Sequence, residues 1–129
     1  NYKPMLGDIK TLSEFENDKV DFSFTWSVLD HIPDKKEVTS IINHLVRVSK
    51  KCCFFIEPYI EGIETDASLK TRGEIKQDLE YKHKTFYKYS YFWNYMKIFN
   101  NLGIQPIVFD LPLHKHSLGP FYKIFFIKK

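Results

Sequence analysis

The sequence predicts an α/β fold with a mainly parallel sheet that ends in an antiparallel pair of strands. Two observations lead to this prediction. Residues 20–59 have the pattern of a strand, a polar turn, an amphipathic helix and a second strand, which together make one βαβ unit. Near the C-terminus, the apolar segments 104–111 and 121–127 are joined by a loop without a helix, so they must be antiparallel neighbours.

The first strand of the βαβ unit alternates between large apolar and small polar side chains over residues 20–26. This period of two is typical of a strand with one buried face. The apolar side consists of Val20, Phe22, Phe24 and Trp26. The side chains on the other side are small enough that a helix could still cover them.

Residues 34–49 predict the helix of the unit. Asp34 is a candidate N-cap, and Glu37 three residues later completes a pattern resembling a capping box. The spacing of the apolar residues predicts a single buried stripe of Val38, Ile41, Ile42, Leu45 and Val46. Residues 52–57 are then apolar on both faces, which is typical of a central parallel strand. The adjacent Cys52 and Cys53 point to opposite faces of that strand and cannot pair in an ordinary disulfide.

The remaining elements follow from turn and cap residues. Residues 4–9 predict a strand that ends in a loop at Gly7 and Asp8. Ser90 can cap a helix over 91–102, with Gly103 as its C-terminal cap. Pro106 places the strand 104–111 at a sheet edge, because proline cannot donate to the ladder. The polar segment 60–84 predicts a lid or substrate wall, with a short helix after Gly73.

Size and composition predict one globular domain over residues 1–129. The chain is 43% hydrophobic and 27% charged, and no apolar run reaches the roughly 20 residues that span a bilayer. We expect no membrane partner, and a cytoplasmic location is the default because no hydrophobic signal segment opens the chain. The net charge of +3 is interspersed rather than gathered in a stripe, which argues against nucleic acid as a partner.

Five segments, taken in order, resemble the C-terminal part of a class I S-adenosylmethionine-dependent methyltransferase. GDI at 7–9 resembles the loop after the third strand of that family, and VDFSFTWSVLDHIPD at 20–34 resembles the fourth strand and its loop. LVRVSKKCCFFIEP at 45–58 resembles a helix end and the fifth strand. GIQPIVFD at 103–110 and FYKIFFIKK at 121–129 resemble the sixth and seventh strands.

The resemblance implies a Rossmann-like sheet whose last two strands form an antiparallel pair, with the sixth strand at the edge. The N-terminal strands of that sheet and the family's glycine-rich cofactor loop are missing from these residues. We therefore expect a partial methyltransferase-like domain that belongs to a longer protein, as the absence of an initiating methionine also suggests. On this interpretation the chain alone binds S-adenosylmethionine weakly or not at all.

The resemblance also implies roles for several residues. Asp8 and Ile9 would approach the adenine of the cofactor, although Asp8 beside Gly7 is equally an ordinary turn residue. Thr25, Trp26 and Ser27 would lie near the transferred methyl group, whereas by sequence alone Trp26 is better explained by core packing.

The substrate side is expected at the ends of the two strands of the βαβ unit. His31 could act as a general base, or be held by a backbone hydrogen bond as a loop histidine. Asp30, Glu57 and Tyr59 would face the methyl acceptor, with a polar strand end as the alternative. We predict no metal site, because His114 and His116 lack an evident third ligand.

Three functions remain as hypotheses. The first is the C-terminal portion of a methyltransferase that acts on a small-molecule or other, unidentified acceptor. The second is a non-catalytic methyltransferase-like module that binds a partner, with self-association expected through an exposed sheet edge. The third is a nucleic-acid binder that stacks bases on the aromatic segment 81–95, which helical spacing from Tyr91 onward explains better as core packing.

Overall fold

The computed structural model of the chain describes residues 7–59, 61, 91–111 and 122–129. Within these residues the elements are the 3₁₀ helices η1 (Ile9–Glu14) and η2 (Leu29–His31), the helices α1 (Lys35–Val48) and α3 (Tyr95–Asn101), and the strands β1 (Val20–Trp26), β2 (Ser49–Pro58), β3 (Ile107–Asp110) and β4 (Tyr122–Lys128). The predicted α/β class is confirmed.

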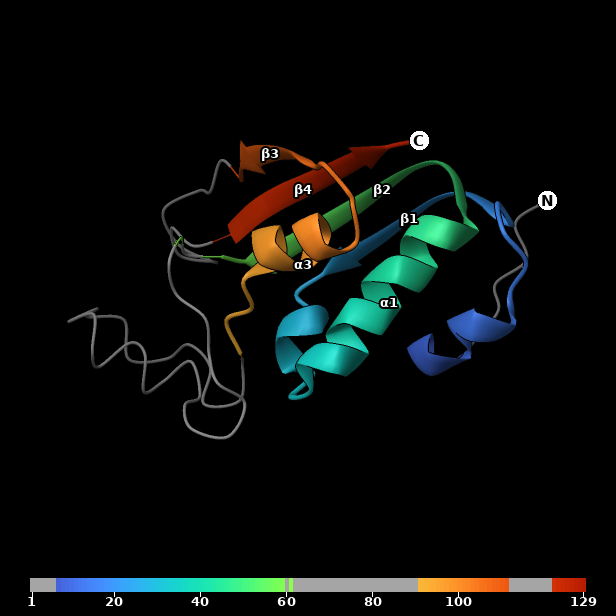
Figure 1. Cartoon of the computed structure of the whole chain (residues 1–129), viewed down its shortest axis with the longest axis horizontal. Coiled ribbons are helices and arrows are strands. Elements are labelled where there is room, and N and C mark those ends of the chain that lie inside the picture. The colour runs from blue at the N-terminus through green and yellow to red at the C-terminus, as the bar shows by residue number, and fades with distance from the viewer. Residues whose placement is uncertain (1–6, 60, 62–90, 112–121) are drawn as a thin grey trace.

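The four strands form one mixed sheet in the order β1-β2-β4-β3 (Figure 1). β1 and β2 are parallel, and β4 runs antiparallel to both of its neighbours, β2 and β3. The prediction of a mainly parallel sheet is therefore wrong for the described strand pairs, of which one is parallel and two are antiparallel. The reason is the position of β4: a reversed strand inside the sheet makes two antiparallel pairings, whereas at the edge it would make one.

Both α1 and α3 lie on the same face of the sheet (Figure 1). α1 begins after Asp34, whose carboxylate accepts a hydrogen bond from the Lys36 amide at 2.8 Å, as the N-cap prediction required. Glu37 pairs with Lys10 Nζ at 3.2 Å, which ties η1 to the first turn of α1. The predicted buried stripe is confirmed except that Val46 is only partly buried; the buried residues are Val38, Ile41, Ile42, Leu45 and Val48.

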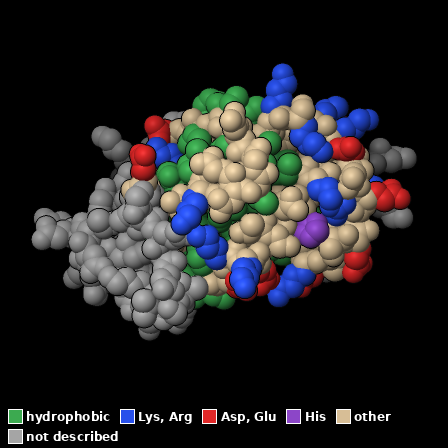
Figure 2. Space-filling view, viewed as in Figure 1, with side chains coloured by type: hydrophobic (Ala, Val, Ile, Leu, Met, Phe, Trp, Pro, Cys, Tyr) green, Lys and Arg blue, Asp and Glu red, His purple; other side chains and the backbone are tan. Residues whose placement is uncertain are grey.

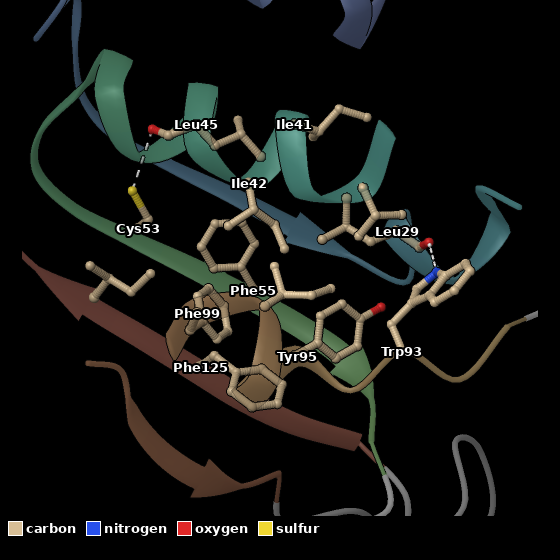
Figure 3. Packing of buried hydrophobic residues seen from close by; sticks show 13 residues of the cluster. Leu29, Ile41, Ile42, Leu45, Cys53, Phe55, Trp93, Tyr95, Phe99 and Phe125 are labelled. Atoms are coloured by element: carbon tan, nitrogen blue, oxygen red, sulfur yellow. Dashed lines mark hydrogen bonds between the residues drawn. The ribbon is translucent and has the colours of Figure 1, made fainter. Parts of the chain in front are cut away.

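The hydrophobic core lies between these two helices and the sheet (Figure 3). Phe125 of β4 is fully buried and packs against the rings of Phe99 and Tyr95, each with a centroid distance of 5.5 Å. Cys53 is buried on the same side, and its thiol contacts the Leu45 carbonyl at 3.5 Å. Cys52 is half-buried, as expected for neighbours that point to opposite faces.

The sheet face opposite the helices is apolar, and neither α1 nor α3 covers it. Residues opposite each other in register share a face, and two rows cross the sheet on this side: Phe24, Phe54, Phe126 and Ile107, then Trp26, Ile56, Ile124 and Phe109. We call these residues, with Phe22, the open face. The predicted alternation of β1 is confirmed, but the small polar side, with Thr25 only 3% exposed, is the one that the helices cover.

Several boundaries differ from the sequence prediction. β2 begins at Ser49, so the residues expected to end the helix belong to the strand. α3 begins after Asn94 rather than Ser90, because the Asn94 side chain accepts from the Lys97 amide at 3.0 Å. Gly103, at φ +70°, follows α3 as the predicted C-terminal glycine. β3 begins just after Pro106 and forms the predicted edge.

The predicted strand over 4–9 is wrong at its end. Residues 1–6 lie outside the described part, and Ile9 begins a 3₁₀ helix. Asp8 starts this helix by accepting from the Lys10 amide at 2.9 Å and from the Thr11 amide at 3.0 Å. Those local bonds replace the ladder bonds of a strand.

Other predictions fall on residues that the structure does not describe. These are the helix after Gly73, the lid or wall at 62–84, the aromatic segment before Tyr91, and the histidines His114 and His116. Within the described part of the chain, no helix is both long enough and apolar enough to cross a membrane.

Candidate functional site

The candidate site lies where β1 and β2 end and β4 begins. The carboxyl ends of parallel strands are where α/β proteins place ligands. The Ser27 amide donates to the Ile56 carbonyl at 2.9 Å, which extends the strand pairing by one residue. Ser27 then takes a left-handed backbone conformation, with φ +50°, and the chain turns away into η2. Non-glycine residues adopt this conformation at a cost, which marks the turn as a site held by its surroundings.

Four polar side chains meet at this turn: Ser27, Asp30, Glu57 and Tyr122. We call them the polar cluster. Ser27 Oγ lies 3.1 Å from Asp30 Oδ1 and 2.9 Å from Tyr122 Oη. A hydroxyl has a single proton to donate. When Ser27 donates to the Asp30 carboxylate, Tyr122 is therefore the donor to Ser27.

Glu57, near the end of β2, contacts the backbone of this turn. Its side chain is fully buried, and Oε1 accepts a hydrogen bond from the Val28 amide at 3.2 Å. The pKa of Glu57 is raised from 4.5 to about 8, mainly by burial and further by the negative charge of Asp30. The hydroxyl of Thr25 and the amides of Val28 and Leu29 lower the pKa by a smaller amount. Near neutral pH, Glu57 is therefore mostly protonated.

The segment before α3 fixes the other side of the turn. The Tyr91 amide donates to the Asp30 carbonyl at 2.7 Å, and Trp93 Nε1 donates to the Leu29 carbonyl at 3.1 Å (Figure 3). Leu29 and Trp93 are both buried. The turn at 27–31 is thus held by contacts from β2, from β4 and from the chain that leads into α3.

The structure brings together four of the residues that the sequence singled out: Thr25, Ser27, Asp30 and Glu57. His31 adjoins them, with Nε2 3.9 Å from Asp30 Oδ1 and its side chain 51% exposed. The imidazole of His31 is therefore accessible to solvent at the rim of the polar cluster.

The other predicted site residues lie apart from the polar cluster. Trp26 is 52% exposed on the open face, so the expectation that it packs in the core is wrong. Tyr59 follows β2 and packs edge-on against Phe125 at 5.4 Å; burial raises the pKa of its hydroxyl. Asp8 is exposed and Ile9 is half-buried at the start of η1, which lies along α1.

The sequence prediction missed Tyr122, Tyr91 and Trp93. Tyr122 was counted only as part of an apolar strand, yet β4 is antiparallel to β2, so its first residue lies at the end of β2, opposite Pro58. A tyrosine at the second position of the predicted final strand was the available signal, because a buried phenol hydroxyl requires a partner.

The site favours proton and hydrogen-bond chemistry. The described residues hold no group of three or more histidine, cysteine, aspartate or glutamate side chains placed to bind a metal ion. What they hold is a protonated buried carboxyl, a second carboxyl with Ser27 as its donor, and an exposed imidazole at the rim.

Comparison with known proteins adds no relative. No protein-family model matches the chain, and neither the curated proteins nor the solved structures contain a significant match. The function must therefore be inferred from the residues and the geometry.

Proposed function

We propose that the chain is the C-terminal portion of an S-adenosylmethionine-dependent methyltransferase, and that the turn at 27–31 lines the place of methyl transfer. The observation that carries the proposal is the strand order. The resemblance requires the sixth strand at the edge and the seventh paired with it. In the structure, β3 is one of the two edge strands, and the last strand, β4, lies between it and β2.

The residues present suit one side of such a cofactor. Asp8 is exposed, and one of its carboxylate oxygens caps η1. Its second oxygen would accept from the amino group of an adenine. Asp30 would lie near the path of a positively charged sulfonium, and its negative charge would favour a cation. Glu57, which is mostly protonated near neutral pH, would add no charge there. Gly7 and Gly103 are the glycines among the described residues, and they do not form a glycine-rich loop.

When bound, the cofactor would supply an activated methyl group. The chain's own contribution is alignment, which is often sufficient for transfer to a nucleophile. Glu57 accepts a hydrogen bond from the Val28 amide, and the Ser27 hydroxyl donates one to Asp30. Together these bonds fix the turn that carries His31. His31 would accept a proton from the acceptor's hydroxyl or amine.

The test is a titration of the isotope-labelled chain with S-adenosylhomocysteine, followed by amide NMR shifts. We expect weak binding, with shifts at 8–10 and 27–31. Asp8→Asn should weaken it, because asparagine preserves the cap but replaces the second carboxylate oxygen with a donor. Asp110→Asn on β3 is the matched control and should leave the titration unchanged. Shifts confined to other segments, micromolar affinity of this chain alone, or equal weakening by Asp8→Asn and Asp110→Asn would count against the proposal.

The alternative is a non-catalytic, methyltransferase-like interaction module. The observation that favours it is the open face, whose aromatic side chains are half or more exposed on β1. The nucleic-acid hypothesis has less support. On the side of the molecule that carries the helices, lysine and arginine side chains are scattered rather than gathered in a stripe (Figure 2).

A further inference from the structure

The open face is the largest feature that the proposed function leaves unexplained. Phe22, Phe24 and Trp26 on β1 are 57%, 62% and 52% exposed, and Ile107 and Phe109 on β3 are 53% and 49% exposed. Parallel pairs such as β1 and β2 are normally covered on both faces. Here α1 and α3 cover one face only.

The exposed area is large enough to form an interface. An aromatic side chain buries roughly 150–250 Å², so four half-exposed aromatics on β1 and β3 present roughly 400 Å². Ile107 and the half-buried central residues Phe54, Ile56, Ile124 and Phe126 extend the same surface. The total approaches the roughly 800 Å² that each partner buries in a stable complex. It also exceeds the few hundred Å² of apolar patch that a soluble monomer usually exposes.

The apolar composition of the open face favours another apolar protein surface as its partner. The two rows across the sheet contain aromatic and aliphatic residues and no charge. Among the described strand residues, lysines reach this side at one end of the sheet, where Lys128 lies opposite Cys52 and Lys50 precedes Cys52 by two residues on β2. A single-stranded nucleic acid would need cations along the face, whereas an equally apolar sheet needs none.

We propose that two copies of this chain pack their open faces together as a two-fold dimer. With the two-fold axis along the strands, β1 of one copy lies over β3 of the other. That arrangement buries the most exposed residues of both outer strands at once, and self-complementary surfaces are the usual basis of two-fold dimers. Sheets packed in this way are about 10 Å apart with interdigitated side chains. The inference does not depend on the methyltransferase proposal.

The experiment is sedimentation of the full chain over a range of concentrations. We expect a reversible monomer–dimer equilibrium, weakened at least about tenfold by Phe109→Glu, because a charge would be buried without a partner. Val108→Glu is the matched control. Val108 is the neighbouring residue, is 39% exposed and points to the opposite face, opposite Phe125. This variant should dimerise normally.

A second measurement does not depend on the variants' folding. Trp26 is exposed on the open face and Trp93 is 1% exposed in the core. Dilution of the wild-type chain should therefore shift the fluorescence to longer wavelength, and Trp26→Phe should remove this shift. A monomer at every concentration would overturn the proposal, as would a dimer that Phe109→Glu and Val108→Glu affect equally. Salt-dependent binding of single-stranded oligonucleotide that protects Trp26 would also overturn it and favour the nucleic-acid hypothesis.

Discussion

At the scale of single residues, the polar cluster shows how neighbours decide what a side chain does. Asp30 and Glu57 are both fully buried carboxyls, but Ser27 donates a hydrogen bond to Asp30, whereas Glu57 accepts one from the Val28 amide. Burial and the charge of Asp30 therefore keep Glu57 protonated to about pH 8.

This pKa predicts that Glu57 makes the fold less stable as the pH rises. The unfolded chain loses the proton near the ordinary value of 4.5, and the folded chain holds it to about 8. Stability should therefore fall between these values and level off above pH 8, by an amount on the order of 4 kcal/mol. Glu57→Gln should flatten the profile: equal to wild type near pH 4.5 and more stable at pH 8, as measured by urea unfolding. A decline that persists in the variant would show that another group causes it.

Ser27 gives a second prediction at this scale, because it combines a left-handed backbone with two side-chain hydrogen bonds. Ser27→Ala keeps the strained backbone and loses both bonds, so it should cost roughly 1–3 kcal/mol. Ser27→Gly loses the same bonds but relieves about 1 kcal/mol of strain, so it should be the more stable of the two. Thermal unfolding of both variants tests this order, and a glycine variant less stable than alanine would contradict it.

At the scale of elements, Arg47 of α1 binds η1 and the residues that follow it, in addition to the Lys10–Glu37 pair. Arg47 donates to the Leu12 carbonyl at 2.8 Å, to the Phe15 carbonyl at 2.6 Å and to the Asn17 side chain at 2.9 Å. The guanidinium group has five N–H donors in a fixed plane and can hold several acceptors at once. The three acceptors come from a segment whose position only the fold defines, so helical spacing does not reveal this role of Arg47.

Replacing Arg47 should therefore loosen η1 while the sheet stays folded. Arg47→Lys should raise amide hydrogen exchange at 9–17, because lysine cannot hold three acceptors in the same geometry. Exchange in β2 should be unchanged. Lys36→Ala on the exposed surface of α1 is the control and should leave residues 9–17 protected. Equal exchange in wild type and Arg47→Lys would mean that the Lys10–Glu37 pair is sufficient to hold the segment.

At the scale of the whole molecule, the layers are unequal: helices and core on one side of the sheet, the open face on the other (Figures 1 and 3). Side chains on the two faces of a strand should therefore contribute very differently to the free energy of unfolding. Phe125 is fully buried among Tyr59, Tyr95 and Phe99, whereas Phe24 is 62% exposed.

A pair of alanine substitutions measures this asymmetry. Phe125→Ala should cost roughly 3–5 kcal/mol by leaving a cavity in the core, a large part of the stability of a domain of this size. Phe24→Ala should change the unfolding free energy of the monomer little. Urea unfolding of both variants, at a protein concentration too low for dimerisation, measures the two losses. Similar losses in both variants would mean that the open face is covered in the folded monomer.

The sequence by itself determined the α/β class, the helix after Asp34, the edge strand after Pro106 and the turn at 27–31. Each of these depends on local chemistry: a capping side chain, a proline that has no amide proton, or a spacing of apolar residues with a period of two or 3.6. The sequence also pointed to Ser27, Asp30 and Glu57, because polar residues at the ends of parallel strands gather at one edge of the sheet.

Tertiary structure decided what local patterns do not contain. It placed β4 between β2 and β3, brought Tyr122 to Ser27 across the sheet, and turned Trp26 outward. Period two in β1 predicts two faces but not which of them the helices cover. Helix α1 packs on the face of Ser23 and Thr25 because the crossover from β1 to β2 lies on that side, so the aromatic residues of β1 form the open face.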